Sequence, residues 1–271
     1  MKKIFLVSCW LLLITSAFAG TVDTVSIYSK ALKKETRFVI ITPSGQKQKA
    51  DHLPVVYLLH GYSGNYSSWL HDAPQLIAKS DELNMILVCP DGGYSSWYFD
   101  SPVDSTFHYE TYITNELIPY IDQKYPTIPD RKHRAITGLS MGGHGAFYLA
   151  FLHKDLFGAA GSISGGVDIR PFPKNWQLDK VLGTQEAHKE NWEKNTVINL
   201  ADQLKNGEQK ITFDCGTADF FLVVNRNLHQ KLLDKNIDHD YAERPGQHNK
   251  AYWGNSIDYQ LLFFKKYFTE K

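Results

Sequence analysis

The sequence predicts an α/β fold in which a mostly parallel central sheet carries helices on both faces. Short, continuous apolar runs, such as residues 53–61 and 85–93, are typical of strands buried on both sides. These runs alternate with segments of helical apolar spacing, and that alternation favours parallel strands joined by helices. The chain has 271 residues, of which 43% are hydrophobic. It is therefore long enough to bury a sizeable core as one domain.

The N-terminal residues 1–19 have the pattern of a secretory signal. Two lysines precede an apolar stretch at residues 4–14, and Ala-Phe-Ala at residues 17–19 fits an A-x-A cleavage site. The apolar stretch is shorter than the ~20 residues that span a bilayer. The "LVSC" ending at Cys9 loosely resembles a lipoprotein cleavage box, but too little apolar sequence precedes this cysteine. We expect a cleaved signal, a mature domain over residues 20–271 and a secreted or periplasmic location.

The elements of the domain follow in a regular order. Residues 22–29 and 36–45 are expected to open the sheet as an antiparallel pair. The remaining predicted strands lie within residues 53–61, 85–93, 133–140, 157–166, 209–216 and 238–246. The predicted helices lie within residues 63–84, 105–126, 141–155 and 222–237 and at the C-terminus. Because most strands are separated by a helix, the sheet is expected to be mostly parallel.

One segment breaks this rhythm. Residues 167–209 show several helical patches and no strand signal, and they include Trp176 and Trp192. We interpret this segment as a helical insertion over the sheet edge, placed before the next strand. Such an insertion is the usual place for a lid or a substrate wall.

A nucleophile motif lies between a predicted strand and a predicted helix. Residues 138–142 read Gly-Leu-Ser-Met-Gly, which is a G-x-S-x-G sequence centred on Ser140. In this context the serine is expected on a sharp turn with its hydroxyl above the sheet. The backbone N–H of Met141 would then face a developing oxyanion. A second donor is expected in the loop after residues 53–61, from the N–H of Tyr62.

A serine needs a base, and the base needs an orienting acid. In the α/β-hydrolase order the acid and then the histidine follow the serine. His248 lies in a loop after the last predicted strand, and Asp219 lies just beyond the strand before it. Asp214 falls within that strand, where its side chain would not reach the top of the sheet. Ser140, Asp219 and His248 are therefore the predicted triad.

Six stretches together resemble the esterase D family of α/β-hydrolases, which includes carbohydrate esterases of family 1, S-formylglutathione hydrolases and mycolyltransferases. They are "YLLHGYSGNYSSW", "PDGGYSSWYFDSP", "YITNELIPYID", "TGLSMGGHGAF", "CGTADFF" and "GQHNKAYW". The resemblance implies the same triad and the same oxyanion donors. It also implies that residues 94–102 border the acyl pocket, with Trp97 and Tyr98 as candidate walls, although core packing explains these aromatics equally well. Gln247 and Asn249 depart from the pattern usual around the family's histidine, which leaves the leaving-group side harder to predict.

The resemblance implies a serine carboxylesterase, and the signal pattern at residues 1–19 predicts that it is secreted or periplasmic. The expected substrates are feruloyl or acetyl esters on plant cell-wall xylan. Two alternatives remain. One is hydrolysis of S-formylglutathione or of general short-chain esters, and the other is transfer of the acyl group to an alcohol instead of to water. A non-catalytic carbohydrate-binding hydrolase fold would normally lack a triad residue. The mechanism requires no metal or cofactor, and no ligand-spaced His, Cys, Asp and Glu cluster is visible in the sequence.

The balance of charges bears on nucleic-acid binding, and the cysteines bear on whether the domain has a disulfide. Lys and Arg number 29 and Asp and Glu also 29; loss of the two lysines in the signal leaves 27 against 29, a net charge of −2. With no basic run, the sequence offers no electrostatic basis for nucleic-acid binding. Cys89 and Cys215 lie in apolar strand-like runs, which favours two buried thiols, although sequence alone does not exclude a disulfide between them. The oligomeric state is left open.

Overall fold

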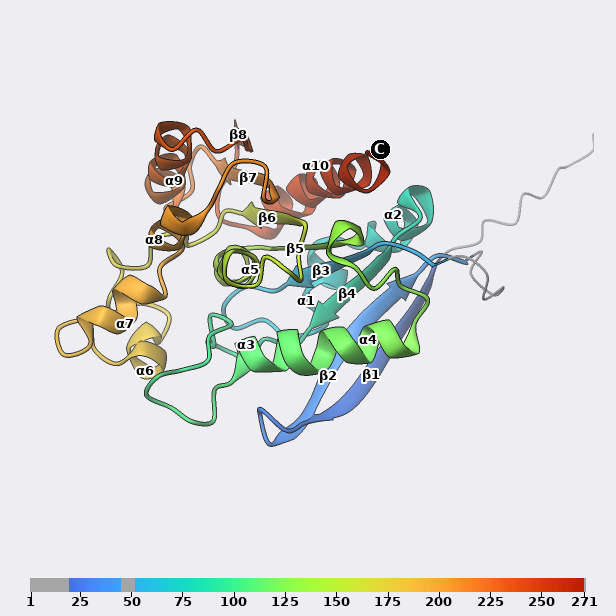
Figure 1. Ribbon diagram of the computed structural model, residues 1–271, viewed down its shortest axis with the longest axis horizontal. Coiled ribbons are helices and arrows are strands. Elements are labelled where there is room, and N and C mark those ends of the chain that lie inside the picture. The colour runs from blue at the N-terminus through green and yellow to red at the C-terminus, as the bar shows by residue number, and fades with distance from the viewer. Residues whose placement is uncertain (1–19, 45–51, 271) are drawn as a thin grey trace, which may run out of the picture.

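A central sheet of eight strands organises the protein. The computed structural model describes residues 20–44 and 52–270, so the predicted signal at residues 1–19 lies outside the described residues. The strand order is β1-β2-β4-β3-β5-β6-β7-β8 (Figure 1). β1 pairs antiparallel with β2, β2 pairs antiparallel with β4, and all remaining pairs are parallel. The predicted mostly parallel sheet and its antiparallel opening pair are confirmed.

The strands match the apolar runs of the sequence. They span Thr21–Ser29 (β1), Lys34–Thr42 (β2), Val55–Leu59 (β3), Ile86–Pro90 (β4), Arg134–Gly138 (β5), Ala159–Ile163 (β6), Lys210–Gly216 (β7) and Asp240–Arg244 (β8). Every residue of β3, β4, β5 and β6 is buried. These four strands form the centre of the sheet, which explains why their sequences are continuous apolar runs without alternation.

The α-helices outside residues 167–209 fill the predicted positions. They are Ser68–Asp72 (α1), Leu76–Leu83 (α2), Tyr109–Thr111 (α3), Ile118–Lys124 (α4), Met141–Leu152 (α5), Leu222–Asp234 (α9) and Lys250–Thr269 (α10). A π-helical turn, Tyr112–Leu117, joins α3 to α4, so residues 109–124 form one helical stretch. Residues 63–84 contain two helices rather than one. Pro74 lies between them, and a proline disfavours helical backbone in the residue before it.

Helices cover the two faces of the sheet in separate groups. Tyr57 and Leu59 of β3 pack with α3, α4, α5 and α9, whereas Val56 and Leu58 pack with α1, α2 and α10. This division follows from the strand itself, in which successive side chains point to opposite faces. Within α5 every residue except Leu152 is buried, because this helix lies between the sheet and the residue 167–209 insertion.

The insertion is helical, as predicted, and no strand occurs in it. It contains Leu178–Leu182 (α6), Lys189–Lys194 (α7), Val197–Leu200 (α8) and a short 3-10 turn, Ala201–Gln203. α6 and α7 lie at one end of the molecule, beyond α5 (Figure 1). Trp192 is fully buried and its Nε1 donates to the carbonyl of Gly183 over 2.9 Å. Trp192 belongs to the same hydrophobic core as α5 and the sheet, so the insertion is packed into the domain.

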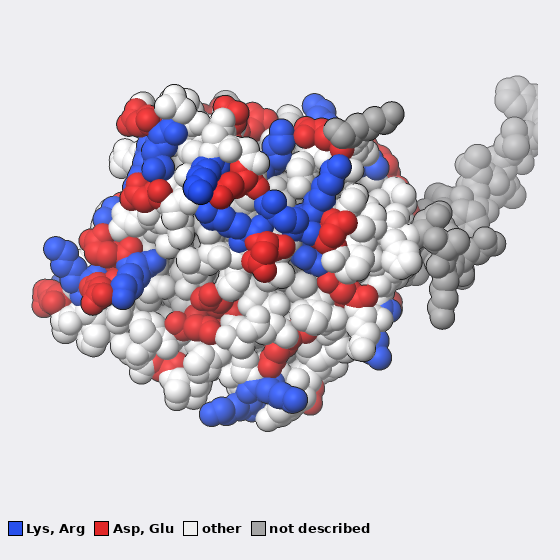
Figure 2. Space-filling view, viewed as in Figure 1, with Lys and Arg blue, Asp and Glu red and all other residues white. Residues whose placement is uncertain are grey.

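The surface charge and the state of the two cysteines can both be compared with what the sequence predicts. Positive and negative side chains are interspersed on the face drawn in Figure 2. Of the helices in the described ranges, none is both long and apolar enough to cross a membrane. Cys89 and Cys215 are both buried and are not joined to each other, which confirms the interpretation of two buried thiols.

Candidate active site

Ser140 occupies a strained turn between β5 and α5. Its backbone has φ +55° and ψ −116°, a conformation that costs energy for a residue with a side chain. A side chain on Gly138 would overlap the carbonyl of Gly142, and one on Gly142 would overlap the carbonyl of Leu59. The turn is therefore possible only with glycine at both flanking positions. It leaves Ser140 partly exposed at the carboxyl end of the sheet.

Ser140, His248 and Asp219 form one hydrogen-bonded row. His248 Nε2 lies 2.9 Å from Ser140 Oγ, and His248 Nδ1 lies 2.8 Å from Asp219 Oδ2. Because a carboxylate only accepts, Nδ1 carries the proton that points to Asp219, and Nε2 is left to accept from the serine hydroxyl. This is the tautomer that a general base requires. The structure thus brings together all three residues predicted for the triad.

The two partners of the serine are held by their own loops. Asp219 is buried, and its Oδ1 accepts the backbone N–H of Phe221 over 2.8 Å, which leaves Oδ2 for His248. His248 precedes the N-cap of α10, where Asn249 Oδ1 accepts the N–H of Tyr252 over 3.1 Å. Asn249, noted above as a departure from the family pattern, therefore has a structural role: it begins the helix that follows the histidine.

The predicted oxyanion donors come from two segments that lie next to Ser140. Met141 is the first residue of α5, so its N–H has no partner within the helix. Tyr62 follows β3 in the neighbouring loop. Neither amide donates to a backbone carbonyl in the described part of the chain. Gly61 lets this loop approach the turn closely, since a Cβ there would lie 2.7 Å from Leu139 Cδ1.

His60 supports the oxyanion loop, and sequence reasoning missed it. Its ring is buried, with Nδ1 2.8 Å from the carbonyl of Gly61 and Nε2 accepting the N–H of Gly92 over 2.8 Å. A ring that donates through one nitrogen and accepts through the other is neutral, and burial lowers its pKa. His60 therefore ties the loop after β3 to the loop after β4. The position of His60 immediately before Gly61, at the start of the oxyanion loop, is the sequence feature that could have indicated this role.

A cavity of about 240 Å³ opens above Ser140. Its aromatic wall consists of Trp176 and Phe220, whose rings are stacked with centroids 5.8 Å apart and planes 21° apart. Phe220 in turn lies against His248, at 4.3 Å between centroids. Trp253 borders the cavity and meets His248 edge-on at 5.1 Å. Trp176 belongs to the insertion, so the insertion does supply part of the wall.

Trp97 and Tyr98, the predicted walls of the acyl pocket, lie beneath the cavity instead. They are 1% and 0% exposed. Trp97 packs against Trp176 at 5.9 Å, and the Tyr98 hydroxyl donates to the carbonyl of His60 over 3.1 Å. The alternative of core packing therefore describes both residues. They support the residues that form the surface of the cavity.

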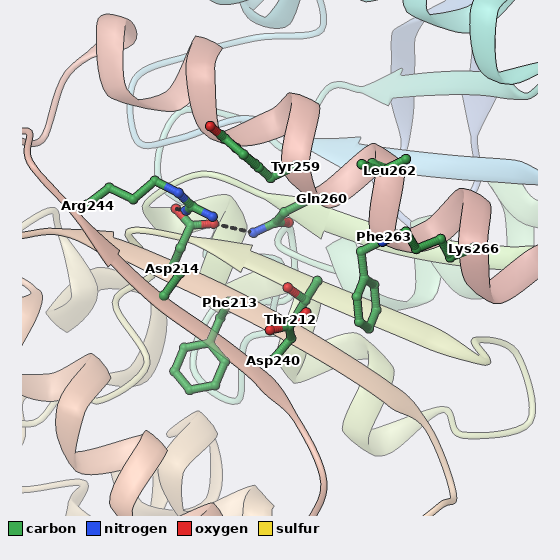
Figure 3. Close-up of a pocket in the computed structure, with 11 residues that line it drawn as sticks. Thr212, Phe213, Asp214, Asp240, Arg244, Tyr259, Gln260, Leu262, Phe263 and Lys266 are labelled. Atoms are coloured by element: carbon green, nitrogen blue, oxygen red, sulfur yellow. Dashed lines mark hydrogen bonds and ion pairs between the residues drawn. The ribbon is translucent and has the colours of Figure 1, made fainter.

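A second hollow, of about 210 Å³, lies between β7, β8 and α10. Its floor is Asp214, which is buried and accepts hydrogen bonds from Tyr252, Ser256 and Gln260 of α10. Figure 3 shows the carboxylate between Gln260 and Arg244; Arg244 Nη1 lies 3.6 Å from Asp214 Oδ1. Asp214 thus anchors the helix that follows His248, and His248 pairs with Asp219 instead, as expected.

Comparison with known proteins places the chain in a family. The model of the family described as "Putative esterase" matches residues 29–264. The acetyl esterase of Caldicellulosiruptor saccharolyticus is 28% identical, with 86% of this chain and 94% of that protein covered. The endo-1,4-beta-xylanase/feruloyl esterase of Xylanibacter ruminicola is 31% identical, with 54% of this chain and 22% of that protein covered.

Solved structures agree with this assignment. A ferulic acid esterase superposes with a TM-score of 0.79 and 28% identity, covering 92% of this chain and 99% of its own. The S-formylglutathione hydrolase from Agrobacterium tumefaciens superposes with a TM-score of 0.78 at 24% identity, covering 93% and 97% of the two chains, and shows the shared fold. The chain therefore belongs to the Putative esterase family and is a carboxylic ester hydrolase with the α/β-hydrolase fold.

Proposed function

We propose that the protein hydrolyses acyl esters through a covalent acyl-enzyme on Ser140. The observation that carries this proposal is the unbroken row from Ser140 Oγ to His248 at 2.9 Å and from His248 to Asp219 at 2.8 Å. A row of this kind lets one group remove the serine proton while the other stabilises the resulting imidazolium.

The reaction follows from the positions of these groups. His248 takes the Ser140 proton as the hydroxyl oxygen attacks the ester carbonyl, and the N–H groups of Tyr62 and Met141 stabilise the oxyanion. Each such donor contributes on the order of 10²–10³ in rate. His248 then gives its proton to the leaving alcohol. Water, deprotonated by the same imidazole, hydrolyses the acyl-enzyme and releases the acid.

The proposed substrate is a feruloyl or acetyl ester on plant cell-wall xylan. Two similar proteins support this range, since one is named an acetyl esterase and one solved structure is a ferulic acid esterase. The stacked pair Trp176 and Phe220 favours the feruloyl group, because a flat aromatic acid can pack on an aromatic wall. The signal pattern at residues 1–19 supports a secreted or periplasmic enzyme that meets such polymers.

A panel of four substrates tests the proposal on the chain from residue 20 onward. Methyl ferulate, acetylated xylan, p-nitrophenyl acetate and S-formylglutathione are compared, with the Ser140→Ala variant as the blank. Preference for the ferulate or the xylan acetate supports the cell-wall assignment and identifies the acyl group. Turnover of p-nitrophenyl acetate alone would leave the serine mechanism intact and remove the polysaccharide substrate. Preference for S-formylglutathione would replace it with a thioester.

A further inference from the structure

The cavity above Ser140 has a second wall of different chemistry. Trp176 and Phe220 form an aromatic wall, whereas this second wall is polar. It consists of Ser63, Ser68 and Asp72, from the loop after β3 and from α1. Small-molecule sites are commonly apolar with a few placed polar groups that set specificity. If the apolar acyl group occupies the aromatic wall, the polar wall is left for the alcohol.

Asp72 is the charged group of this wall, and neither the fold nor the triad uses it. In residues 20–44 and 52–270 its carboxylate accepts no hydrogen bond and has no cation within 4 Å. It is partly buried, and this burial raises its pKa against the opposing effect of His71 and Lys250. A partly desolvated carboxylate without a partner, in a cavity beside a nucleophile, is characteristic of a functional group.

The position of Asp72 is rigid. It is the last residue of α1, and its carbonyl packs so closely on α10 that a Cβ at Gly254 would lie 2.5 Å away. Gln75, the N-cap of α2 three residues further on, ties the next helix to α10 as well, because its Nε2 donates to the Gly254 carbonyl over 2.6 Å and to Asp258 Oδ1 over 3.3 Å. An acceptor held this firmly loses little entropy when a ligand binds.

The neighbours of Asp72 indicate what it accepts from. Ser68 Oγ accepts the N–H of Asn65 over 2.9 Å, and its own proton remains available to a ligand. The partly exposed ring of Trp253 closes the wall. A carboxylate with an aromatic ring also suits a cationic alcohol, but the positive charge of Lys250 acts on the same carboxylate and opposes a second cation. Neutral hydroxyl groups are the better match.

We propose that Asp72 is a specificity-determining residue that accepts hydrogen bonds from the hydroxyl groups of a polyhydroxylated alcohol, the sugar part of an ester substrate. Ser63, Ser68 and Trp253 complete this alcohol subsite. The assignment rests on the proposed ester hydrolysis and extends it from the acyl group to the leaving group. Hydrogen bonds to a charged acceptor are stronger than those between neutral groups, so this residue would dominate the choice of alcohol.

The test compares two esters that share an acyl group and differ in the alcohol: a feruloyl ester of a pentose and methyl ferulate. For Asp72→Ala we expect kcat/KM on the pentose ester to fall on the order of tenfold, mainly through KM. Methyl ferulate should change by less than about twofold, because it has no hydroxyl for Asp72. Asp72→Asn keeps the size and one acceptor and should lie between. A parallel pair, an acetylated pentose and ethyl acetate, separates the alcohol effect from the acyl group.

Asp258→Asn is the matched control. Asp258 is a nearby acid of α10 that accepts from Gln75 at the start of α2 but is not among the residues that line the cavity, so the ratio of the two rates should not move. Equal losses on both esters in Asp72→Ala, or no loss on either, would overturn the subsite. So would a selective loss on a choline ester of the same acid, which would indicate a cationic alcohol. Failure of the proposed function looks different: the wild-type protein would hydrolyse none of these esters above the Ser140→Ala blank.

Discussion

The ring of Phe220 packs against the imidazole of His248, with 4.3 Å between their centroids. Phe220 is 52% exposed, so the ring is not placed there by core packing. It continues into Trp176, which reaches the cavity from the insertion and rests on buried Trp97. An exposed aromatic surface that begins at the proposed catalytic base is suited to an aromatic substrate.

Trp176→Ala should therefore lower the rate of hydrolysis of esters with aromatic acyl groups more than that of acetyl esters. The truncation removes the outer part of the stack, and we expect kcat/KM on methyl ferulate to fall about tenfold or more. Hydrolysis of p-nitrophenyl acetate should stay within about twofold, since an acetyl group is too small to reach the indole. Steady-state rates on the two esters measure this. A parallel fall on both would show that Trp176 supports the site without contacting the acyl group.

Ser140→Ala should lower ester turnover by up to ~10⁶. Asp219→Asn should lower kcat by on the order of 10⁴, because an amide in this position favours the wrong tautomer of His248. Neither change should unfold the chain, since both are small changes of volume. Rates on p-nitrophenyl acetate, with circular dichroism for folding, check both. Asp238→Asn is the control, because Asp238 is an exposed acid just before the first residue of β8. Near-normal activity in Ser140→Ala would remove the serine from the mechanism.

Asp214→Ala should lower the free energy of unfolding by about 3 kcal/mol or more. The change strips the acceptor from Tyr252, Ser256 and Gln260, and buried donors left without a partner are costly. Urea denaturation measures the loss. Asp240→Ala is the control, because Asp240 borders the same hollow (Figure 3) but is exposed. A stability change of similar size in the two variants would mean that the α10 anchor is not what matters.

His144 should make the fold sensitive to acid. Its Nε2 lies 3.0 Å from the carbonyl of Asn195, and burial lowers its pKa to about 3. An unfolded histidine titrates near 6.5, so between pH 6.5 and 3 the unfolded chain binds a proton that the native chain does not. The free energy of unfolding therefore falls as the pH falls, by roughly 1 kcal/mol per pH unit from this residue.

Urea unfolding between pH 7 and pH 5 checks this slope against His144→Gln, whose side chain can still donate to Asn195 but cannot be protonated. We expect the variant to lose less stability per pH unit than the wild type, even if it is less stable at pH 7. Identical slopes would mean that other buried groups, such as His60, account for the acid sensitivity.

Much of the fold and of the candidate site could be predicted because it depends on patterns within short stretches of the sequence. The buried strands are continuous apolar runs, because helices cover both faces of the sheet and bury the side chains that point to either face. The Ser140 turn needs glycine at both neighbours, which makes it visible as a motif. The order of elements then left few places for the partners of the serine, and His248 and Asp219 occupy them.

The lining of the cavity was decided by the tertiary structure. Trp97, Tyr98, Trp176 and Phe220 are all aromatics near a loop in the sequence, yet the first two are buried and the last two form the surface. Which of them water or substrate reaches depends on the elements that pack over each, and those elements lie far away in the chain, as Trp176 does from Trp97. Burial is a property of the assembled layers, so short-range patterns do not determine it. The sequence determined the residues that we propose as nucleophile, base and acid, whereas the packing of the insertion and of α1 against α10 determined the surface that a substrate would meet.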